Sequence, residues 1–292
     1  MTRHTLLAVD VGGTKLEVGL VDAESGSVLT RHRAPTLRTG DAEDLLALVF
    51  DLAMATLDDA AGPAPGACGI GCGGPLSLRD RTVSPLNIAQ WRRFPLASRI
   101  EERFGLVTHV DNDAKALTLA EGWLGVARGK SNYLAMVVST GIGAGLVVDG
   151  RLLDGDDGNA GHIGHLVVVP GGREHAGIAG SLEGEASGTA IEAHTGRPAS
   201  EADLTWRVRT GTLVGRAVGG VANLLDLDVA VVAGSVALGY GTDFFDSAQA
   251  EIDRVARLDH SIGTRIVPAG LGADGPLVGA AAVSLYRTGR LR

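Results

Sequence analysis

The feature that most constrains the fold is a repeated unit of short apolar runs joined by glycine turns. The first copy has runs from Leu6 to Val9 and from Leu16 to Val21, separated by Asp10 and a Gly-Gly pair, and then a run from Val28 to Arg33. The second copy lies about 130 residues later, in the runs 133–138, 144–148 and 151–153. Short strands around such turns predict a β-meander. Two copies of one unit predict two lobes that face each other.

Helical periodicity fills the segments between these strands. Apolar residues recur at three- and four-residue steps over 41–60, 113–123, 205–225 and 247–258. Strands followed by helices, as in GLVTHVDNDAKALTLAEGWLG and DVAVVAGSVALG, are typical of parallel α/β layers. We therefore predict an α/β fold with one meander in each half.

Length and composition limit the class of protein. At 292 residues the chain is longer than a usual single domain, and 45% hydrophobic with 21% charged residues is enough for packed cores. The formal net charge of -8 gives no general attraction for a polyanion, so we expect no nucleic-acid partner.

The cysteines and the apolar runs indicate the compartment. Cys68 and Cys72 lie four residues apart in a glycine-rich apolar segment, which suits buried free thiols better than a disulfide framework or a thiolate metal site. The N-terminal apolar run is too short for a signal peptide, and no window reaches the ~20 apolar residues of a membrane span. We expect a cytoplasmic protein with no membrane partner.

Both glycine turns have the chemistry of an anion site. In VDVGGTK, Gly12 and Gly13 let the backbone approach a ligand, while Thr14 adds a hydroxyl and Lys15 a charge. The second turn repeats this chemistry with Ser139, Thr140, Gly141, Ile142 and Gly143. One such turn is more often only a tight turn, but two matched turns favour phosphate binding. Neither fits the P-loop or the dinucleotide fingerprint, so the phosphates are expected between two hairpins.

Asp10 ends the first predicted strand, next to the first glycine turn. Mg²⁺ binds phosphates together with one or two carboxylates and keeps several waters. We expect Asp10 to hold Mg²⁺ directly or through water. The alternative is that Asp10 only caps the turn.

In total the motifs resemble those of the ROK family of sugar kinases and repressors, in the actin-like ATPase superfamily. They run in order through the chain: AVDVGGTK at 8–15, GIGCGGP at 69–75, SPLNIAQW at 84–91, HVDNDA at 109–114, STGIGAG at 139–145, GNAGHIGH at 158–165, LEGEASG at 182–188, AGS at 233–235 and LVGAAAV at 277–283. The resemblance implies a two-lobed actin-like, ribonuclease H-like ATPase fold with a ligand cleft between the lobes. We place the N-terminal lobe at 1–112 and the C-terminal lobe at 113–292, with a C-terminal helix that could pack back on the first lobe.

The resemblance implies ATP-dependent phosphorylation of a hexose at the 6-hydroxyl, with ATP and Mg²⁺ as cofactors and a homodimeric enzyme. Glucose is the first candidate substrate. The alternatives are fructose, mannose or an N-acetylhexosamine such as N-acetylmannosamine, and polyphosphate in place of ATP.

The family pattern assigns roles to matching positions. Asp113 matches the general base that takes the proton from the sugar hydroxyl, and Asp111 would point elsewhere if its strand continues. Asn87 and Asn112 match hydroxyl binders, with Gly74 beside them. The plainer alternatives are a helix N-cap at 111–113 and a loop-stabilising role for Asn87.

The phosphates are expected on both glycine turns, and the adenosine near the turn that contains Gly234 and Ser235.

The loop over 161–183 departs from the family in its metal ligands. His165 and Glu183 match sugar contacts and are kept, but the three zinc-binding cysteines of the family are replaced by Glu174, Ala176 and Ser181. A structural zinc needs four good ligands. We expect no zinc here. The alternative is a rebuilt site from Glu174 and the histidines 162, 165 and 175.

His162 stands where the family has Glu. A carboxylate accepts from two neighbouring hydroxyls, whereas a neutral imidazole offers one donor and one acceptor. We therefore expect His162 among the substrate-binding residues, with a shift in sugar preference; the alternative is an ordinary loop histidine.

Two readings without kinase activity remain. A sugar-sensing repressor needs a helix-turn-helix domain, and the first strand begins near Leu6, which leaves no room for one before it. A sugar-binding pseudokinase would be expected to lose Asp113 or the glycine turns, and both are present.

Overall fold

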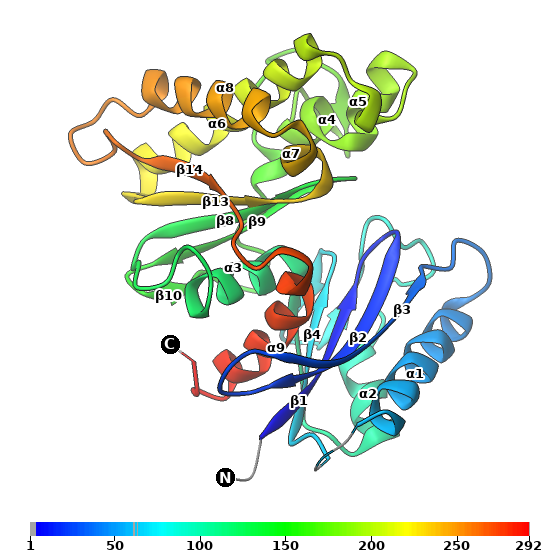
Figure 1. Ribbon diagram of the computed structural model, residues 1–292. Coiled ribbons are helices and arrows are strands. Elements are labelled where there is room, and N and C mark those ends of the chain that lie inside the picture. The colour runs from blue at the N-terminus through cyan, green and yellow to red at the C-terminus, as the bar shows by residue number, and fades with distance from the viewer. Residues whose placement is uncertain (1–3, 61, 63, 292) are drawn as a thin grey trace. The chain divides into compact units, whose positions relative to one another are not determined.

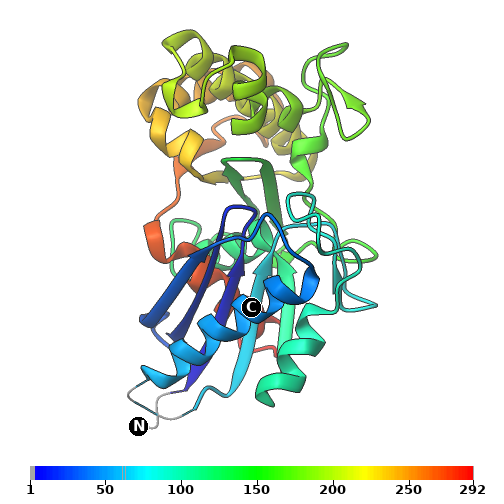
Figure 2. The ribbon, with the colours of Figure 1, turned by 90° about the vertical axis from the view of Figure 1, so that its right-hand side faces the viewer.

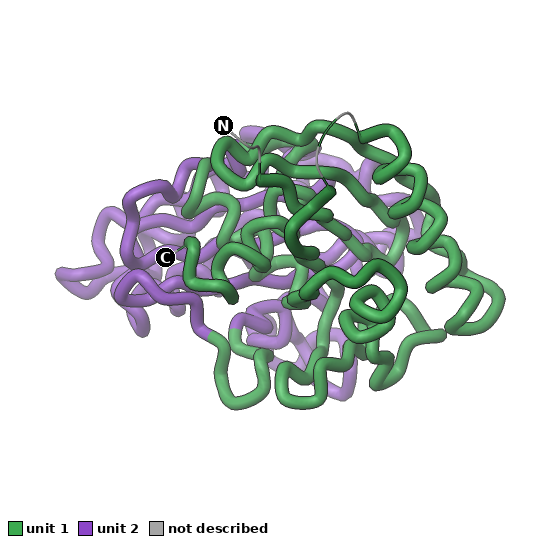
Figure 3. The backbone as a smooth tube through the Cα atoms, turned by 90° about the horizontal axis from the view of Figure 1, so that it is seen from below, with its two compact units in different colours: residues 1–124, 154–160, 271–292 green, residues 125–153, 161–270 purple. Residues whose placement is uncertain are grey.

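The structure, a computed structural model, describes residues 4–60, 62 and 64–291. The chain forms two compact units, drawn in different colours in Figure 3. Unit 1 comprises residues 1–124, 154–160 and 271–292, and unit 2 comprises residues 125–153 and 161–270.

Within its described residues, unit 1 is built on a five-stranded sheet of order β3-β2-β1-β4-β7. The meander of β1 (Thr5–Val11), β2 (Lys15–Asp22) and β3 (Val28–Pro35) is antiparallel. Two further strands, β4 (Ala67–Cys72) and β7 (Thr108–Asn112), run parallel to β1.

Helices cover both faces of this sheet. Successive side chains of β1 point to opposite sides, so its apolar residues need a packing partner on each face. Leu7 and Val9 are buried with α1 (Ala42–Asp58) and α2 (Leu96–Phe104), whereas Leu6 and Ala8 are buried with α9 (Gly275–Arg287). Figures 1 and 2 show α1 and α2 on one side of the sheet and α9 on the other. The near-continuous apolar sequence of β1 is therefore the consequence of burial on two faces.

Unit 2 repeats this plan, with a described five-stranded sheet of order β10-β9-β8-β13-β14. The meander consists of β8 (Tyr133–Val138), β9 (Ile142–Val148) and β10 (Arg151–Leu152). The strands β13 (Val229–Ala233) and β14 (Arg265–Pro268) are parallel to β8. The predicted α/β fold with one meander in each half is confirmed.

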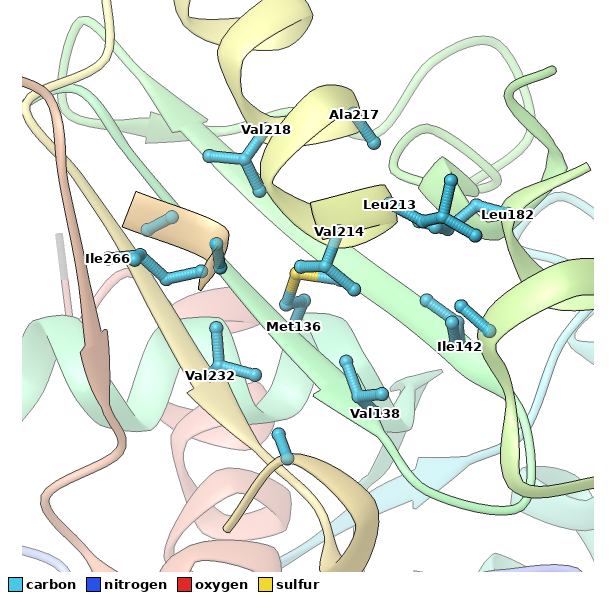
Figure 4. Close-up of a cluster of buried hydrophobic side chains, with 14 of the residues drawn as sticks. Met136, Val138, Ile142, Leu182, Leu213, Val214, Ala217, Val218, Val232 and Ile266 are labelled. Carbon is cyan, nitrogen blue, oxygen red and sulfur yellow. The ribbon is translucent and has the colours of Figure 1, made fainter. Parts of the chain in front are cut away.

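The main core of unit 2 lies between this sheet and two long helices, α6 (Leu204–Leu225) and α8 (Thr242–Val255). Figure 4 shows Met136 and Val138 of β8 pointing toward Val214 and Val218 of α6. Alternate residues of β8 thus face one helical layer, as period-2 patterning requires.

Shorter elements complete the two units. Unit 1 also contains α3 (Asp113–Trp123), the hairpin of β5 (Leu76–Ser77) and β6 (Thr82–Val83), and the 3₁₀ helix η3 (Gly272–Asp274). Unit 2 also contains α4 (Leu182–Ala186), α5 (Gly188–Thr195), α7 (Ser235–Tyr240), the 3₁₀ helices η1 (Ile163–His165) and η2 (Ala199–Glu201), and the hairpin of β11 (Glu174–His175) and β12 (Ile178–Ala179). No helix in the described ranges combines the length and apolar character needed to span a membrane.

The division of the chain differs from the expected boundary after residue 112. Helix α3 stays with unit 1 because it packs against α9 and β4, and the chain leaves this unit only after Leu124. Residues 154–160 and 271–292 then return to unit 1, and α9 packs on β1 and β4. Unit 1 is therefore assembled from three separate stretches of chain.

A network of charged side chains links these three stretches. Asp111, which is fully buried, pairs with Lys115 at 3.1 Å and with Arg287. Asp154 accepts from Lys115 at 2.5 Å and from Arg287 Nη1 at 2.6 Å. Burial opposes ionisation of Asp154, but hydrogen bonds from Arg287 and Lys115 hold its pKa below the usual value. Each of the three stretches of unit 1 thus contributes a charged side chain that pairs with an opposite charge from another stretch.

Candidate active site

Unit 1 brings two predicted functional carboxylates together beside β4. Asp10 lies at the end of β1 and Asp113 is the first residue of α3. A side chain placed on Gly71 of β4 would lie 3.6 Å from Asp10 Oδ1 and 3.7 Å from the Cα of Asp113. The parallel strands β1, β4 and β7 end side by side, which is why residues about 100 apart in sequence meet here.

The environment of Asp10 disfavours its charged form. Burial, followed by the nearby charge of Asp113, raises the pKa of Asp10 to about 7, with Lys15 acting in the opposite direction. A bound cation would offset both the cost of burying the Asp10 charge and its repulsion from Asp113, since a positive charge favours ionised carboxylates. The donor set at this position therefore fits a hard cation such as Mg²⁺.

The structure separates Asp111 from Asp113. Strand β7 continues through Asp111 to Asn112, so neighbouring side chains alternate in direction, and Asp111 is committed to Lys115 and Arg287. Asn112 is the N-cap of α3, with its side-chain oxygen accepting from the Ala114 amide at 3.0 Å. Asp113 Oδ1 accepts from the same amide at 2.8 Å.

The first glycine turn packs directly on the loop that carries Asn87. Gly12 N donates to Lys15 O at 3.0 Å and closes the turn. A side chain on Gly13 would lie 2.7 Å from the Cβ of Asn87, so only glycine allows this approach. Gly74 O accepts from Leu86 N at 3.0 Å and holds the same loop from its other side. Asn87, Gly13 and Gly74 therefore form one local cluster.

The charge of Lys15 is shared with a buried partner. Lys15 Nζ pairs with Glu17, which is 1% exposed, and Arg31 Nε lies 2.9 Å from the same carboxylate. Thr36 fixes the turn further, since its hydroxyl donates to Gly12 O at 2.7 Å and its amide donates to Thr14 O at 3.1 Å. Charged side chains of Lys15, Glu17 and Arg31 therefore lie next to the first turn.

The second glycine turn, in unit 2, is built from neutral groups. Ser139 Oγ lies 3.0 Å from Ser235 Oγ, so two predicted nucleotide-binding residues are brought together. Gly234, directly before Ser235, has a φ of 103°, and a side chain there would collide with the carbonyl oxygen of Val138. The carbonyls of Ser139 and Thr140 accept from the first amides of α5, at 2.7 and 3.2 Å. The remaining turn residues, Gly141 and Gly143, flank Ile142 at the start of β9.

The predicted sugar residues of unit 2 lie around η1 and α4. The rings of His162 and His165 are 5.7 Å apart, edge to face. Nδ1 of His165 is buried and has no hydrogen-bond partner in the described part of the chain. Glu183, in the first turn of α4, accepts from Ile142 N at 2.6 Å, which joins the sugar loop to the second glycine turn.

The three positions that replace the family's zinc cysteines do not form a metal site. Glu174 is exposed and pairs through its backbone with Ala179, while Ala176 lies in the hairpin turn with a φ of 50°. Ser181 is buried, and its hydroxyl accepts from Gly184 N at 3.2 Å as the N-cap of α4. Over the described ranges, no three His, Cys, Asp or Glu side chains are gathered to hold a metal ion. These residues do not fit a tetrahedral zinc.

Sequence reasoning missed the residues that hold these groups in place. His175 lies 2.9 Å from Glu183, whereas the sequence suggests for it only the role of a metal ligand in a rebuilt zinc site. Arg287 and Asp154 are far from Asp111 in sequence, and no local pattern links them. A charged residue near the end of an otherwise apolar helix, as Arg287 is in α9, is the only available signal.

Two sheets of identical strand order, each with a glycine turn after its first strand, define the actin-like class of ATPase folds. The ROK family model matches residues 6–286, and the chain belongs to the ROK family.

Individual relatives are sugar kinases. The chain is 37% identical to the glucokinase of Thermotoga maritima over 194 residues, 65% of this chain and 60% of that protein. It is 34% identical to the N-acetylmannosamine kinase of Yersinia pestis strain Pestoides F over 251 residues, 80% of this chain and 84% of that protein. The matched stretch spans only 57–60% of the length of this glucokinase and of those from Streptomyces coelicolor and Halalkalibacterium halodurans.

The fold is similar to the crystal structure of a ROK family glucokinase from Streptomyces griseus in complex with glucose and AMPPNP. The TM-score is 0.82 at 27% identity, with 95% of this chain and 98% of that chain covered. The similarity therefore extends over both units.

Proposed function

We propose that this protein is an ATP-dependent sugar kinase that phosphorylates the 6-hydroxyl of a hexose, with glucose as the first candidate. The observation that carries the proposal is the separation of the two neighbouring aspartates. Asp111 is buried in an ion network, whereas Asp113 lies beside Asp10, the acid at the end of β1 just before the first glycine turn. Membership of the ROK family and the sugar kinases among its relatives support the same activity.

Asp113 acts as the general base in this proposal. Its carboxylate takes the proton of the sugar hydroxyl, the hydroxyl oxygen forms a bond to the γ-phosphorus of ATP, and the bond to the β-γ bridging oxygen breaks to release ADP. By the family pattern, the side chains assigned to the sugar hydroxyls, through their donors and acceptors, are Asn87, Asn112, His162, His165 and Glu183. Phosphoryl transfer needs mainly such positioning and charge stabilisation.

The glycine turns bind the phosphates, through the amides around Gly12 and Gly13 and around Gly141 and Gly143, apart from the Ile142 amide, which donates to Glu183. Ser235 and Gly234 lie at the adenosine side, consistent with the contact between Ser139 and Ser235. Mg²⁺ neutralises charge on the β- and γ-phosphates when bound, and Asp10 would hold it directly or through water.

We expect His162, which stands where the family pattern has Glu, to affect the choice of sugar. The N-acetylmannosamine kinase relative, matched over 80% of this chain, makes an N-acetylhexosamine the second candidate. The family resemblance also implies a cytoplasmic homodimer, and light scattering after size-exclusion chromatography tests the association.

A coupled ADP-release assay with ATP and Mg²⁺ tests the function, using glucose, mannose, fructose, N-acetylglucosamine and N-acetylmannosamine as acceptors. Polyphosphate as a second donor releases no ADP, so its use is tested by measuring the sugar phosphate formed. We expect sugar-dependent release with one preferred sugar. Sugar binding without release from any sugar would contradict a kinase and favour a sugar-binding sensor.

A further inference from the structure

The carboxylate of Glu183 is held at both oxygens within unit 2. Oε2 accepts a hydrogen bond from Ile142 N at 2.6 Å, and Oε1 lies 2.9 Å from His175 Nε2. The side chain of Glu183 is 14% exposed, so it is only partly accessible to solvent. Two contacts from opposite ends fix a carboxylate much more firmly than one, because they remove its rotation about the last side-chain bond.

The two contacts come from different segments. Ile142 belongs to the second glycine turn, and a side chain on neighbouring Gly141 would lie 3.0 Å from Glu183 Oε2. His175 belongs to the β11–β12 hairpin, and a side chain on Gly184 would lie 2.8 Å from its Cβ. Glu183 is therefore packed between the glycine turn and the hairpin.

The hairpin that carries His175 has its own anchors. Its turn at Ala176 and Gly177 has φ values of 50° and 79°, as tight two-residue hairpins require. At its base, Gly180 N donates to Arg173 O at 2.8 Å, and Arg173 N donates to Glu185 Oε1 at 2.6 Å. The hairpin is thus a short but fixed support for the imidazole.

The base of the hairpin is in turn tied to the core of unit 2. Glu185 is 2% exposed and forms an ion pair with Arg209 of α6, and Arg209 Nη1 also donates to Glu185 O at 2.7 Å. A buried carboxylate with a charged partner and an amide donor is well satisfied. These contacts occupy the loop region in which the family pattern places its zinc.

We propose that His175 is a positioning residue that orients Glu183 for sugar binding, through its Nε2–Oε1 hydrogen bond. The proposal rests on the sugar kinase function proposed above. His175 lies between Glu174 and Ala176, two of the positions at which the family pattern has zinc-binding cysteines. In this chain, protein hydrogen bonds therefore replace the metal in shaping the sugar site.

The test compares two variants that separate the hydrogen bond from the packing of the ring. His175→Phe keeps a ring of similar size without a donor, and His175→Gln keeps an N–H donor. Loss of a hydrogen bond to a charged group weakens the binding that depends on it by about tenfold. We expect His175→Phe to raise the KM for the preferred sugar about tenfold and His175→Gln to stay within about threefold of the wild type.

The KM for ATP and the Tm are the readouts that a general structural defect would move. Both should stay near the wild-type values in the two variants, because the Ile142 contact and the Glu185 anchor remain. Glu174→Gln, an exposed neighbour on the same strand, is the matched control and should leave all three quantities unchanged. If His175→Phe does not fold, His175→Asn replaces it, since the shorter amide cannot reach Oε1.

An unchanged sugar KM in His175→Phe would overturn the proposal, and so would equal increases in His175→Phe and His175→Gln. If the wild type phosphorylates none of the sugars but binds one, the kinase function fails while the calorimetric Kd of the same variants still decides the role of His175. A wild type that neither binds nor phosphorylates any sugar of the panel overturns both proposals.

Discussion

The two glycine turns follow the first strands of two sheets with the same strand order, yet they carry different chemistry. The turn of unit 1 is surrounded by charges, with Asp10 and Asp113 near its base and Lys15 paired to Glu17. The side chains of the unit 2 turn itself are neutral: the hydroxyls of Ser139 and Ser235 border it, and the carboxylate of Glu183, from α4, accepts from its Ile142 amide. The repeated strand order fixes where a turn lies, whereas the side chains decide which ionisable groups stand beside it.

The difference also affects how each carboxylate is stabilised. Asp10 is next to another acid and has a raised pKa. Glu183, beside the neutral turn, accepts an amide hydrogen bond and contacts His175. The carboxylate of Asp10 therefore fits a bound cation, whereas that of Glu183 is already satisfied by protein groups.

The largest expected effect follows from removing the proposed base of unit 1. Asp113→Asn should lower kcat by about 10²- to 10⁴-fold, because the amide cannot accept the hydroxyl proton. The Kd for the sugar, measured by calorimetry, should change by less than about threefold. Asp156→Asn, an exposed residue of the same unit, serves as the control, and a normal kcat in Asp113→Asn would remove it as the base.

The next effect concerns the ion network of unit 1. Arg287→Met keeps the aliphatic stem but removes a charged partner of the buried Asp111 and of Asp154, which should cost about 3–5 kcal/mol in the free energy of unfolding. Urea unfolding followed by circular dichroism measures this, with Arg290→Met as an exposed control on the segment after α9. A loss of less than about 1 kcal/mol would mean that the network contributes little.

A smaller effect should depend on pH. Because the folded-state pKa of Asp10 is raised to about 7, its contribution to stability is present below about pH 4 and is lost as the pH rises through 7. Asp10→Asn cannot ionise, so the metal-free variant should gain about 1–3 kcal/mol over the wild type at pH 8 and little at pH 4. Asp51→Asn, on the exposed side of α1, is the control, and parallel stability curves for wild type and Asp10→Asn would contradict the raised pKa.

Removing a hydroxyl at the neutral turn should have a weaker consequence. Ser235→Ala loses its hydrogen bond to Ser139, which is worth about 1 kcal/mol, so the KM for ATP should rise by about fivefold. The KM for the sugar should not follow. Exposed Ser200→Ala is the matched control, and a change confined to the sugar KM would place Ser235 in the sugar site instead.

The smallest expected effect is that of a chelator. Elemental analysis of the purified protein should find less than one zinc per chain, and treatment with a zinc chelator followed by return of Mg²⁺ should leave the sugar KM unchanged. The reason is that Ala176 and Ser181 cannot complete a tetrahedral site with His165. Stoichiometric zinc would overturn this interpretation of the loop.

Much of the fold could be predicted because its determinants are local. The runs that predict β1, β2 and β8 alternate or are continuously apolar, and the pattern over 113–123 matches α3 as the structure has it. Helix α8 begins at Thr242 rather than Ser247, since its first turn contains Phe244, which is buried in the core. Helix α5 has only two buried residues and therefore no clear periodicity.

The site could be predicted only as far as its motifs reach. Asp113 and Glu183 could be proposed because they stand in recognisable sequence patterns. The partners that fix such groups, such as His175 for Glu183 and Arg287 for Asp111, depend on contacts between segments that the fold brings together. A hydrogen bond between residues 8 or 176 positions apart leaves no periodic trace in the sequence.

The position of α9 has a consequence for synthesis on the ribosome. This helix covers the face of the first sheet that contains Leu6 and Ala8, but it spans residues 275–287. The sheet of the nascent chain therefore keeps that apolar face without α9 while the whole of unit 2 is being made. Unit 2 can complete its core first, and the N-terminal sheet matures last, so a stalled chain that lacks α9 would present this face to chaperones.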